Sequence, residues 1–494
     1  MTDSASAKDL VKHSTIYAIG NVARQLVGFL MLPVYTRYLT PADYGAVGLI
    51  LFAVSLMEPL LGARLAQAVP KFFYEFDEEG KRKSVISTAC TATAVLSALS
   101  VLGLVAFRGP LSIVVFGRHD YGTVFALFST LLFSQAVENY GLMYMRIRRA
   151  PVLFVSVNLV KLIVQLSLGI WFVVVLRWGV LGVAVASATS TLLSGVGLAM
   201  YTFRHAGLHF DRTLAWKMVG YCWPLWLAGL ATLYLFSSNR YYMRLFSSLD
   251  EIGLYELAAR FAAVIGFLIW EPFMQFWNTE RFIYAKHENA ADKFNAVFNV
   301  MCAGLVMITL GISVFAPDVI SVMSSPAFHG AGSSVPFLTL ATVFNCLLTF
   351  CQFSFLLTGN TKWIWQNNLL VAGIITILNL ALIPTLGHVG ASLALMFSLA
   401  IQFAIVQATS RRYFDMKLSN RTLISSLVIA SIAYLLTLLW GSAEHLLLDL
   451  SLKVGICIVA AVLIGTVLLS NRSIRERLVE LPPAIRLLER FKRA

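Results

Sequence analysis

Stretches of about 20 apolar residues recur along almost the whole chain, separated by short polar connections. An α-helix needs about 20 such residues to cross the hydrocarbon of a bilayer. The pattern therefore predicts an all-α integral membrane protein of about 14 transmembrane helices. The expected spans are 14–38, 44–69, 84–106, 121–145, 152–176, 180–203, 214–238, 253–277, 294–316, 333–357, 366–385, 388–408, 421–441 and 452–470.

Composition agrees with a chain that faces lipid. Of its 494 residues, 58% are hydrophobic and 13% are charged, and the mean hydropathy is +0.77. A soluble surface would need more charge than this. The net charge of +13 comes from basic residues scattered through short connections, without an RNA-binding motif or a continuous basic face, so we expect no nucleic-acid partner.

The basic residues also indicate how the helices are oriented. With the N-terminus in the cytoplasm, most of the 38 Lys and Arg residues lie in cytoplasmic loops and tails, as the positive-inside rule requires. Both termini are then cytoplasmic, and the protein is a multi-pass protein of the inner membrane. The basic residues left in connections on the opposite side are Arg37, Arg108, Arg118, Arg177, Arg244 and Lys453.

The first six spans and the next six resemble one another at a nearly constant spacing. RYLTPADYG begins at Arg37, and RLFSSLDEIG begins 207 residues later at Arg244. A spacing of 208 relates Gly45 to Gly253, Phe107 to Phe315, and Gly179, Gly182 and Ala186 to Gly387, Gly390 and Ala394. Two parallel repeats are a common plan of transporters, in which the cargo binds between the halves.

The repeat divides the chain into four parts. We expect an N-terminal six-helix bundle over 1–210, a second six-helix bundle over 211–418, helices 13 and 14 over 419–470, and a basic cytoplasmic tail over 471–494. No connection between spans exceeds about 20 residues, so no soluble domain is expected to bind ATP or to carry a catalytic site.

The sequence gives no sign of a metal or an organic cofactor. All six cysteines lie inside apolar stretches, without the Cys or His spacing of a zinc site. There is also no GxxxxGK[ST] phosphate loop. We therefore expect neither metal nor cofactor, and leave open coupling to H⁺ or Na⁺.

Five basic residues fall within the expected spans: Arg24, Arg64, Lys161, Arg240 and Arg260. A charge at the bilayer centre costs about 2.5 to 3.5 kcal/mol on insertion scales, so each needs a partner, a wet cavity or a ligand. Arg24 and Lys161 are placed deepest and have no opposite charge three or four residues away, which favours a water-filled interior surface over a bridge to another helix.

The other three cations have simpler explanations. Arg64 and Arg240 lie near a membrane face, where the side chain could extend to the interface. Arg260 follows Glu256 by one turn, a spacing that favours a local ion pair. Guanidinium groups bind phosphate oxygens with two donors at once, so a cationic cavity of these residues would suit a pyrophosphate.

Two segments and the helix count point to a family. YTRYLTPADYG after the polar first helix, NRYYMRLFSSLDEIGLYELAARF at the start of the second half, and twelve plus two helices resemble the polysaccharide flippases of the multidrug/oligosaccharidyl-lipid/polysaccharide exporter superfamily. The resemblance implies a V-shaped pair of six-helix bundles. It also implies a carrier that moves an undecaprenyl-pyrophosphate-linked oligosaccharide from the inner to the outer leaflet by alternating access, without ATP.

The resemblance also ranks the candidate site residues. Similar flippases line their cavity with arginines on helices 1, 2 and 8, which implies Arg24, Arg64 and Arg260 here, followed by Arg240 and Lys161. Members of the family often carry Asp-Arg near the end of helix 7, where this chain has Asn239-Arg240. A role that needs a carboxylate there is in doubt, whereas a role that needs the cation is not.

The empty carrier must return, and a proton or Na⁺ could bias that step. Glu58, Glu138 and Asp43 are the candidate coupling residues, although capping of a helix is at least as good an explanation for Asp43. Expected partners are the lipid-linked oligosaccharide and membrane lipids, with the polysaccharide polymerase machinery as a candidate. The sugar, the surface polysaccharide, the coupling ion and the oligomeric state are not predicted.

Three alternatives remain open. A multidrug antiporter of the same fold would export organic cations, but it would need unpaired carboxylates, whereas the deepest charges here are basic. A membrane glycosyltransferase or polysaccharide polymerase usually has a large outer loop with catalytic carboxylates, and no outer loop here is long enough. A structural assembly partner would leave the intramembrane cations unexplained.

Overall fold

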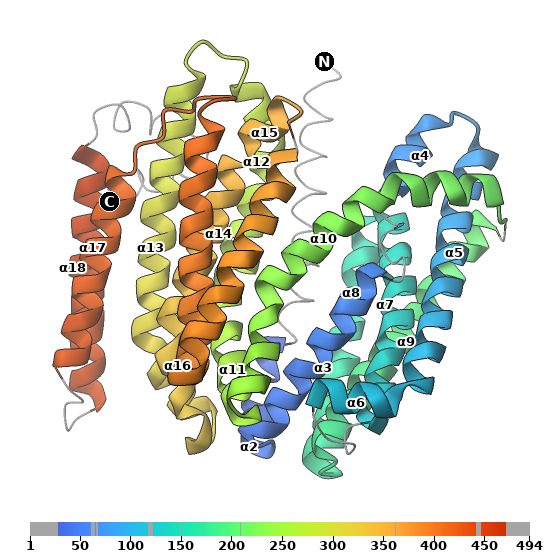
Figure 1. Ribbon diagram of the computed structural model, residues 1–494, viewed down its shortest axis with the longest axis horizontal. Helices are drawn as coiled ribbons and strands as arrows, with labels where there is room; N and C mark the ends of the chain where they lie inside the picture. The colour runs from blue at the N-terminus through green and yellow to red at the C-terminus, as the bar shows by residue number, and fades with distance from the viewer. Residues whose placement is uncertain are drawn as a thin grey trace. The chain divides into compact units, whose positions relative to one another are not determined.

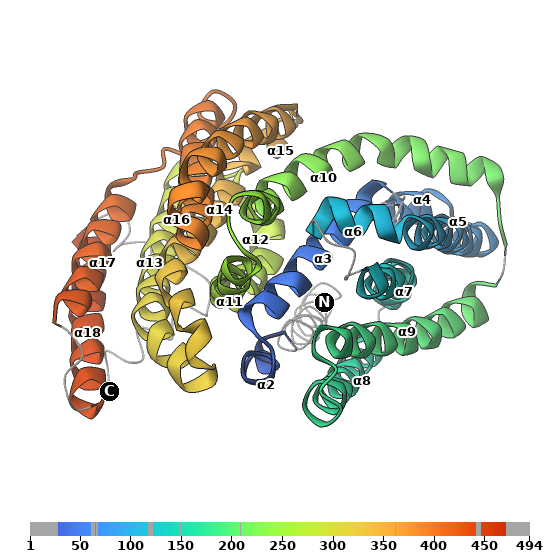
Figure 2. The same cartoon turned by 60° about the horizontal axis from the view of Figure 1, so that its bottom comes forward.

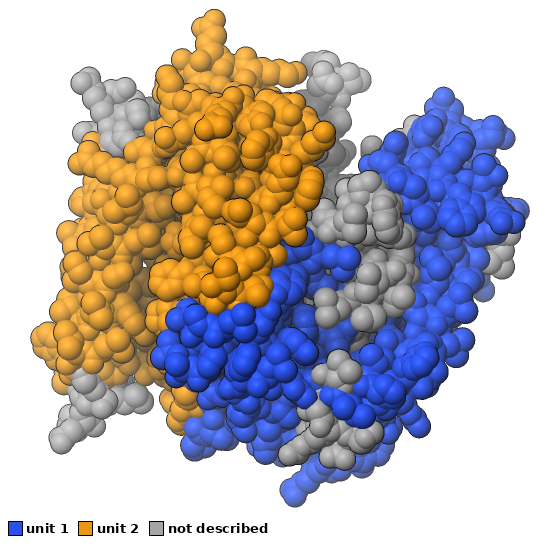
Figure 3. All heavy atoms as spheres, viewed as in Figure 1, with its two compact units in different colours: residues 1–257, 323–328, 379–391 blue, residues 258–322, 329–378, 392–494 orange. Residues whose placement is uncertain are grey.

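The computed structural model describes residues 28–60, 65, 68–116, 122–148, 150–207, 209–360, 362–440 and 446–470. These residues form helices joined by short turns, and no strand occurs among them. The chain divides into two compact units (Figure 3). Unit 1 comprises residues 1–257, 323–328 and 379–391, and unit 2 comprises 258–322, 329–378 and 392–494.

Nine helices in the described part are long and apolar enough to cross a membrane, so the prediction of an all-α membrane protein is confirmed. Several predicted spans agree with observed helices within a few residues. The span 84–106 lies in α5 (Glu79–Ala106), 152–176 in α8 (Pro151–Ile170) with the π-helix η2 (Trp171–Val175), and 180–203 in α9 (Gly179–Ala206). The total of about 14 helices stays a prediction.

Unit 1 is built around α5, α7 (Gly122–Ile147) and α9, which lie side by side in both views (Figures 1 and 2). A buried cluster around Tyr140 and Cys90 joins all three, and a second cluster, around Phe154 and Leu198, joins α7 and α9 to α8. The remaining helices of this unit are α2 (Leu32–Tyr38), α3 (Pro41–Leu60), α4 (Val69–Glu75), α6 (Arg108–Phe116) and α10 (Arg212–Phe246). The sequence did not predict α4 and α6 as separate short helices.

The first turns of α3 and α11 (Leu249–Ile265) cross within unit 1 at two glycines. A Cβ atom on Gly45 would overlap the carbonyl oxygen of Leu249, and a Cβ atom on Gly253 would overlap that of Pro41. Pro41 and Leu249 are 208 residues apart, as are the two glycines. The contact is therefore reciprocal, and each repeat presents the same position to the other because only glycine allows so close an approach of backbones.

The repeat also recurs in the backbone of two turns. Gly179, the first residue of α9, has φ +56°, and Gly387, inside the long helix α16 (Lys362–Ser410), has φ +54°. Gly387 interrupts α16 at the predicted boundary between spans 366–385 and 388–408. The Glu251 carboxylate accepts the backbone N–H of His388 at 2.7 Å and lies 2.6 Å from its Nδ1. It thereby caps the second half of α16.

Unit 2 contains the C-terminal part of α11, continued by the π-helix η3 (Gly266–Trp270) and by α12 (Glu271–Tyr284). A buried aromatic cluster surrounds Trp277, whose ring stacks on Phe350 and meets Phe294 edge-on. The other helices of the unit are α13 (Ala290–Met323), η4 (Pro326–Ser334), α14 (Val335–Cys351), α15 (Phe353–Leu357), α16, α17 (Arg421–Leu439) and α18 (Leu446–Ser470).

The hairpin of α17 and α18 is attached to α13 through an ion cluster in unit 2. Lys453 donates to both carboxylate oxygens of Asp318, at 2.9 and 2.8 Å, and lies 2.7 Å from a carboxylate oxygen of Asp449 one turn earlier on α18. Residues Leu310 and Val314 of α13 pack with Ala433 and Ala460 beside it. The ion cluster and this apolar contact together hold the last two helices against the rest of unit 2.

Candidate functional site

The candidate residues differ in how far the structure places them. Arg24, Arg64 and the side chain of Glu58 lie outside its described part. Asp43, Glu138, Lys161 and Arg240 belong to unit 1, and Arg260 belongs to unit 2. The site can therefore be built from two buried charge pairs of unit 1 and from Arg260 considered by itself.

The first pair joins α7 to α8. Lys161 Nζ lies 2.8 Å from Oε1 and 2.6 Å from Oε2 of Glu138. The hydroxyl of Ser194, on α9, lies 3.2 Å from the same carboxylate and 3.0 Å from the carbonyl oxygen of Thr191, so it can donate to either. The side chains of Lys161 and Glu138 are only 13% and 5% exposed. Three helices thus meet at a buried group that is neutral overall.

This pairing corrects the expectation for Lys161. The sequence favoured a cation facing water without a carboxylate, because residues three and four positions away carry no opposite charge. The partner lies 23 residues away on the neighbouring helix, where spacing along one helix cannot reveal it. Lys161 in this conformation is neutralised and has little to offer an anionic ligand, whereas Glu138 keeps a place among the candidate coupling residues.

The second pair joins α10 to α11 inside unit 1. Arg240 donates through Nε to Glu256 and through Nη1 to the carbonyl oxygen of Phe236 at 3.0 Å. Its guanidinium carbon lies 5.4 Å from the centre of the Tyr255 ring. Glu256 is buried, and its negative charge cancels that of Arg240, so this pair is also neutral overall.

Two neighbours fix the second pair in place. Asn239 donates to the hydroxyl of Tyr255 and so holds the aromatic ring against Arg240. On the other side, a Cβ atom on Gly48 would lie 2.5 Å from the Glu256 side chain. Glycine at position 48 leaves room for the carboxylate between α3 and α11. The sequence paired Glu256 with Arg260, and it did not anticipate the contact with Arg240.

Asp43 lies in the first turn of α3. The Asp43 carboxylate accepts the backbone N–H of Thr40 at 3.1 Å and its hydroxyl at 2.8 Å, while Thr40 Oγ1 accepts the backbone N–H of Asp43 at 3.1 Å. This reciprocal arrangement is a capping box at the start of α3, which is the alternative role that the sequence allowed. Arg260 is partly buried in α11, just before the π-helix η3.

Among the described residues, no group of three or more His, Cys, Asp or Glu side chains lies close enough together to hold a metal ion. What the site offers is a set of buried ion pairs at helix contacts. Removing one partner of such a pair is strongly destabilising, because the other charge is then left buried and uncompensated. Ser194, Asn239 and Tyr255 were missed as members, and the only sequence feature that marks them is their polarity within apolar spans.

One protein family and several solved membrane transporters resemble this chain. A family model described as "Polysaccharide biosynthesis protein" matches residues 10–275. No protein with a curated description matches the sequence. Solved structures of membrane transporters match over most of the chain, at sequence identities that establish the fold alone.

The lipid II flippase MurJ in an inward closed conformation is 12% identical and has a TM-score of 0.74, over 92% of this chain and 99% of that one. The MATE multidrug transporter DinF-BH, solved as a complex, is 15% identical with a TM-score of 0.61, over 84% and 98%. An outward-facing MATE family transporter of the MOP superfamily is 14% identical with a TM-score of 0.58, over 83% and 97%. The chain therefore shares its fold with the lipid II flippase and with these MATE transporters.

Proposed function

The chain belongs to the polysaccharide biosynthesis protein family, and we propose that it is a flippase for an undecaprenyl-pyrophosphate-linked oligosaccharide repeat unit. It moves this cargo from the cytoplasmic to the periplasmic leaflet of the inner membrane by alternating access, for the assembly of a cell-surface polysaccharide. Both termini are cytoplasmic in this proposal. The family match carries it, because that match selects polysaccharide assembly among the activities that the fold supports.

Structural similarity gives further support. The lipid II flippase moves a lipid-linked cargo by its name, and it resembles this chain over a larger share of its length and with a higher TM-score than either multidrug transporter. The sequence segments around Arg37 and Arg244 resemble polysaccharide flippases in particular. Cargo chemistry of this kind would require cations that can reach the pyrophosphate.

Arg24, Arg64 and Arg260 are the residues proposed to bind the pyrophosphate. Each guanidinium can bond two phosphate oxygens at once, which offsets part of the cost of drawing an anion into the membrane. Lys161 and Arg240 take a secondary role, because Glu138 and Glu256 neutralise them. They would contact the cargo only in a conformation in which those pairs have opened.

The membrane potential can supply the driving force. Moving one elementary charge through 100 mV is worth about 2.3 kcal/mol, so outward movement of roughly two negative charges gains on the order of 4 to 5 kcal/mol. The return of the empty carrier is the step that an ion could assist. Glu138 is the proposed point of proton coupling, because it is a buried carboxylate that links α7 to Lys161 of α8 and to Ser194 of α9.

Helix irregularities are available for the movement itself. The π-helix η3 separates α11, which carries Arg260, from α12, and Pro272 occupies the first turn of α12. Single-turn π-helices within α-helices are frequent at functional sites and loosen the regular bonding pattern. We propose that Arg260 changes its position through bending at Gly266–Trp270.

The experiment that tests the function uses cells that depend on this chain for surface polymer. Replacement of Arg24 or Arg260 by Ala should abolish polymer export and leave lipid-linked precursor on the inner leaflet. Replacement of Arg421, an exposed residue at the start of α17, should leave export unchanged. Normal export in both cavity variants, with normal amounts of protein in the membrane, would remove these arginines from the cargo site.

The multidrug antiporter is the second candidate, because the two MATE structures compared above are multidrug transporters by their names. An exporter of organic cations would lower accumulation of the fluorescent cation ethidium in cells that express the chain. The flippase proposal predicts equal accumulation with and without expression. Association with a polysaccharide polymerase is part of the proposal and could be tested by co-purification from the same cells.

A further inference from the structure

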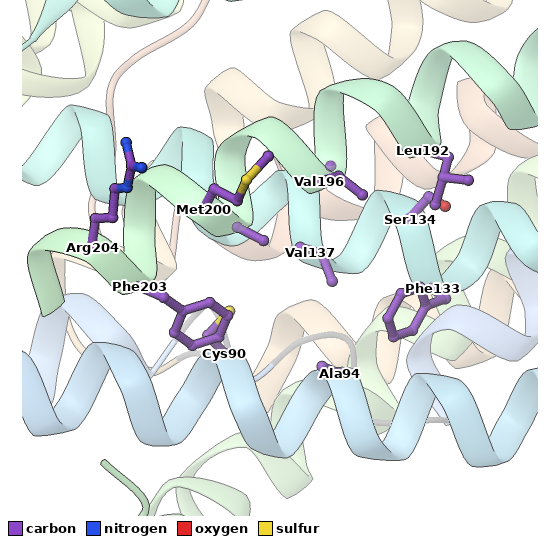
Figure 4. A pocket seen from close by; sticks show the side chains of 12 residues that line it. Cys90, Ala94, Phe133, Ser134, Val137, Leu192, Val196, Met200, Phe203 and Arg204 are labelled. Atoms are coloured by element: carbon purple, nitrogen blue, oxygen red, sulfur yellow. The ribbon is translucent and has the colours of Figure 1, made fainter. Parts of the chain in front are cut away.

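A cavity of about 540 Å³ opens in unit 1 between α5, α7 and α9. Its lining is apolar except for Ser134 and Arg204. Figure 4 shows the rings of Phe203 and Phe133 towards its two ends, with Ala94 of α5 between them. An apolar cavity of this kind has no partners for water and accepts apolar groups instead.

One side of the cavity faces outward along α9. Leu192, Val196 and Met200, spaced at four residues, line it and are each about half exposed (48%, 48% and 56%). On a helix that is long and apolar enough to cross a membrane, such residues contact lipid chains. At its floor, Gly195 lets α9 approach α7, since a Cβ atom there would lie 3.1 Å from the carbonyl oxygen of Ser134. The cavity therefore opens to the bilayer.

Arg204 provides a charge at one end of the cavity. It lies in the last turn of α9, and Figure 4 shows it beyond Phe203, at the end away from Leu192. Its exposed guanidinium has no hydrogen bond or ion pair with another residue in the part of the chain that the structure describes. A cation at the end of a lipid-facing apolar cavity matches a lipid with an anionic headgroup.

The second repeat fills the corresponding position with its own side chains. Phe298 and Phe403 stand 208 residues beyond Cys90 and Gly195, two residues of the cavity lining. Their rings stack with centroids 6.4 Å apart and are buried in unit 2. The cation is nevertheless repeated, because Arg412 follows Arg204 by 208 residues. The packing of these three helices therefore does not require an opening, and Arg412 is a natural control.

We propose that this cavity binds one acyl chain of an anionic phospholipid from the surrounding bilayer, with the phosphate of that lipid held by Arg204. The bound lipid supplies the apolar contacts that Phe298 and Phe403 provide in unit 2. It occupies the leaflet in which α9 ends, and it acts as a structural ligand of α5, α7 and α9 rather than as cargo. The proposal depends on insertion in a membrane and not on the identity of the transported molecule.

Native mass spectrometry of the full chain tests this binding. Delipidated protein is mixed with palmitoyl-oleoyl phosphatidylglycerol or with the phosphatidylcholine of the same chains, and dissociation constants are measured for the first bound lipid. We expect one tightly bound phosphatidylglycerol. Replacement of Arg204 by Gln should weaken it roughly fivefold, since one cation at a membrane surface contributes about 1 kcal/mol. Replacement of Arg412 by Gln should leave it unchanged.

A second pair of variants tests the acyl-chain part. Ala199→Phe places a ring in the cavity and should weaken both lipids, whereas Leu193→Phe, on α9 but outside the cavity lining, should weaken neither. If Ala199→Phe does not fold, Val196→Trp fills the cavity from its exposed side.

Three results would overturn the proposal. Equal losses for Arg204→Gln and Arg412→Gln would reduce the effect to general charge attraction. Retention of both lipids by Ala199→Phe or Val196→Trp would mean that the acyl chain binds outside the cavity. Displacement of phosphatidylglycerol by a lower concentration of undecaprenyl phosphate would make the cavity a cargo site.

Discussion

Replacing Lys161 with methionine should destabilise the protein more than replacing Lys161 and Glu138 together. The methionine keeps most of the length of the lysine stem but leaves the Glu138 carboxylate buried without its cation. The complementary change, Glu138→Leu, leaves the Lys161 ammonium without its carboxylate in a place where the side chain is only 13% exposed. The double variant removes both charges and replaces the ion pair between α7 and α8 by an apolar contact.

The structure sets the expected sizes. Removing one partner of a buried ion pair costs about 3 to 5 kcal/mol. Ser194 can still donate to Glu138, and one such bond is worth about 1 kcal/mol. We therefore expect a loss of about 3 kcal/mol for Lys161→Met and about 4 kcal/mol for Glu138→Leu. The double variant should lie within about 1 kcal/mol of the parent, because apolar replacement of a whole buried pair is often neutral.

Unfolding by sodium dodecyl sulfate in mixed micelles, followed by tryptophan fluorescence, would give the four free energies of a double-mutant cycle. Lys83 and Glu79 are the matched control, because their side chains meet at 2.9 Å but are 43% and 81% exposed. Their cycle should show little coupling, since water screens exposed pairs. Additive losses in the Lys161 and Glu138 cycle would refute the reasoning, and would return Lys161 to the group of unpaired cations.

Three further outcomes follow from the packing. Gly45→Ala and Gly253→Ala should each abolish polymer export, because a Cβ atom would overlap the facing backbone, whereas Gly304→Ala should be tolerated because the space around its Cβ is open. Normal export in both of the first two variants would contradict the close contact of α3 with α11. Arg240→Lys should lower the free energy of unfolding by about 1 to 3 kcal/mol, measured by thermal melts in detergent. One ammonium group cannot bond Glu256 and the Phe236 carbonyl and also stack on Tyr255. An unchanged melting temperature would argue against this geometry. Lys453→Met should loosen the hairpin of α17 and α18 from α13, because Asp318 and Asp449 lose their shared cation. Protease should then cleave the connection between α16 and α17 faster. Unchanged cleavage rates would show that the apolar contact alone holds the hairpin.

Much of the fold follows from patterns within the sequence. The apolar spans predicted α5, α8, α9 and α17 within a few residues, since hydrocarbon thickness fixes the length of a membrane helix. The spacing of 208 residues also carried structural meaning. It relates Gly179 to Gly387, which share a positive φ, and Gly45 to Gly253, which meet at one crossing. Both pairs are positions where only glycine suits the backbone.

The charge pairs could not be obtained in the same way. Glu138 and Lys161 are separated by 23 residues, and Arg240 and Glu256 by 16. Contacts between neighbouring helices depend on how each helix is rotated about its axis, and apolar residues on every side of a buried helix leave that rotation undetermined. The short helices α4 and α6 were missed because seven to nine residues give too few turns for a periodic pattern.

Translocation by the purified protein tests the central proposal most directly. Proteoliposomes would contain undecaprenyl pyrophosphate bearing a sugar with a nitrobenzoxadiazole label, and dithionite would report the fraction in the outer leaflet. A potassium gradient with valinomycin would set the potential across the bilayer. The flippase account predicts that a negative interior speeds outward movement of this cargo, with no effect on labelled phosphatidylcholine. No movement of the labelled cargo, together with transport of ethidium by the same vesicles, would contradict it.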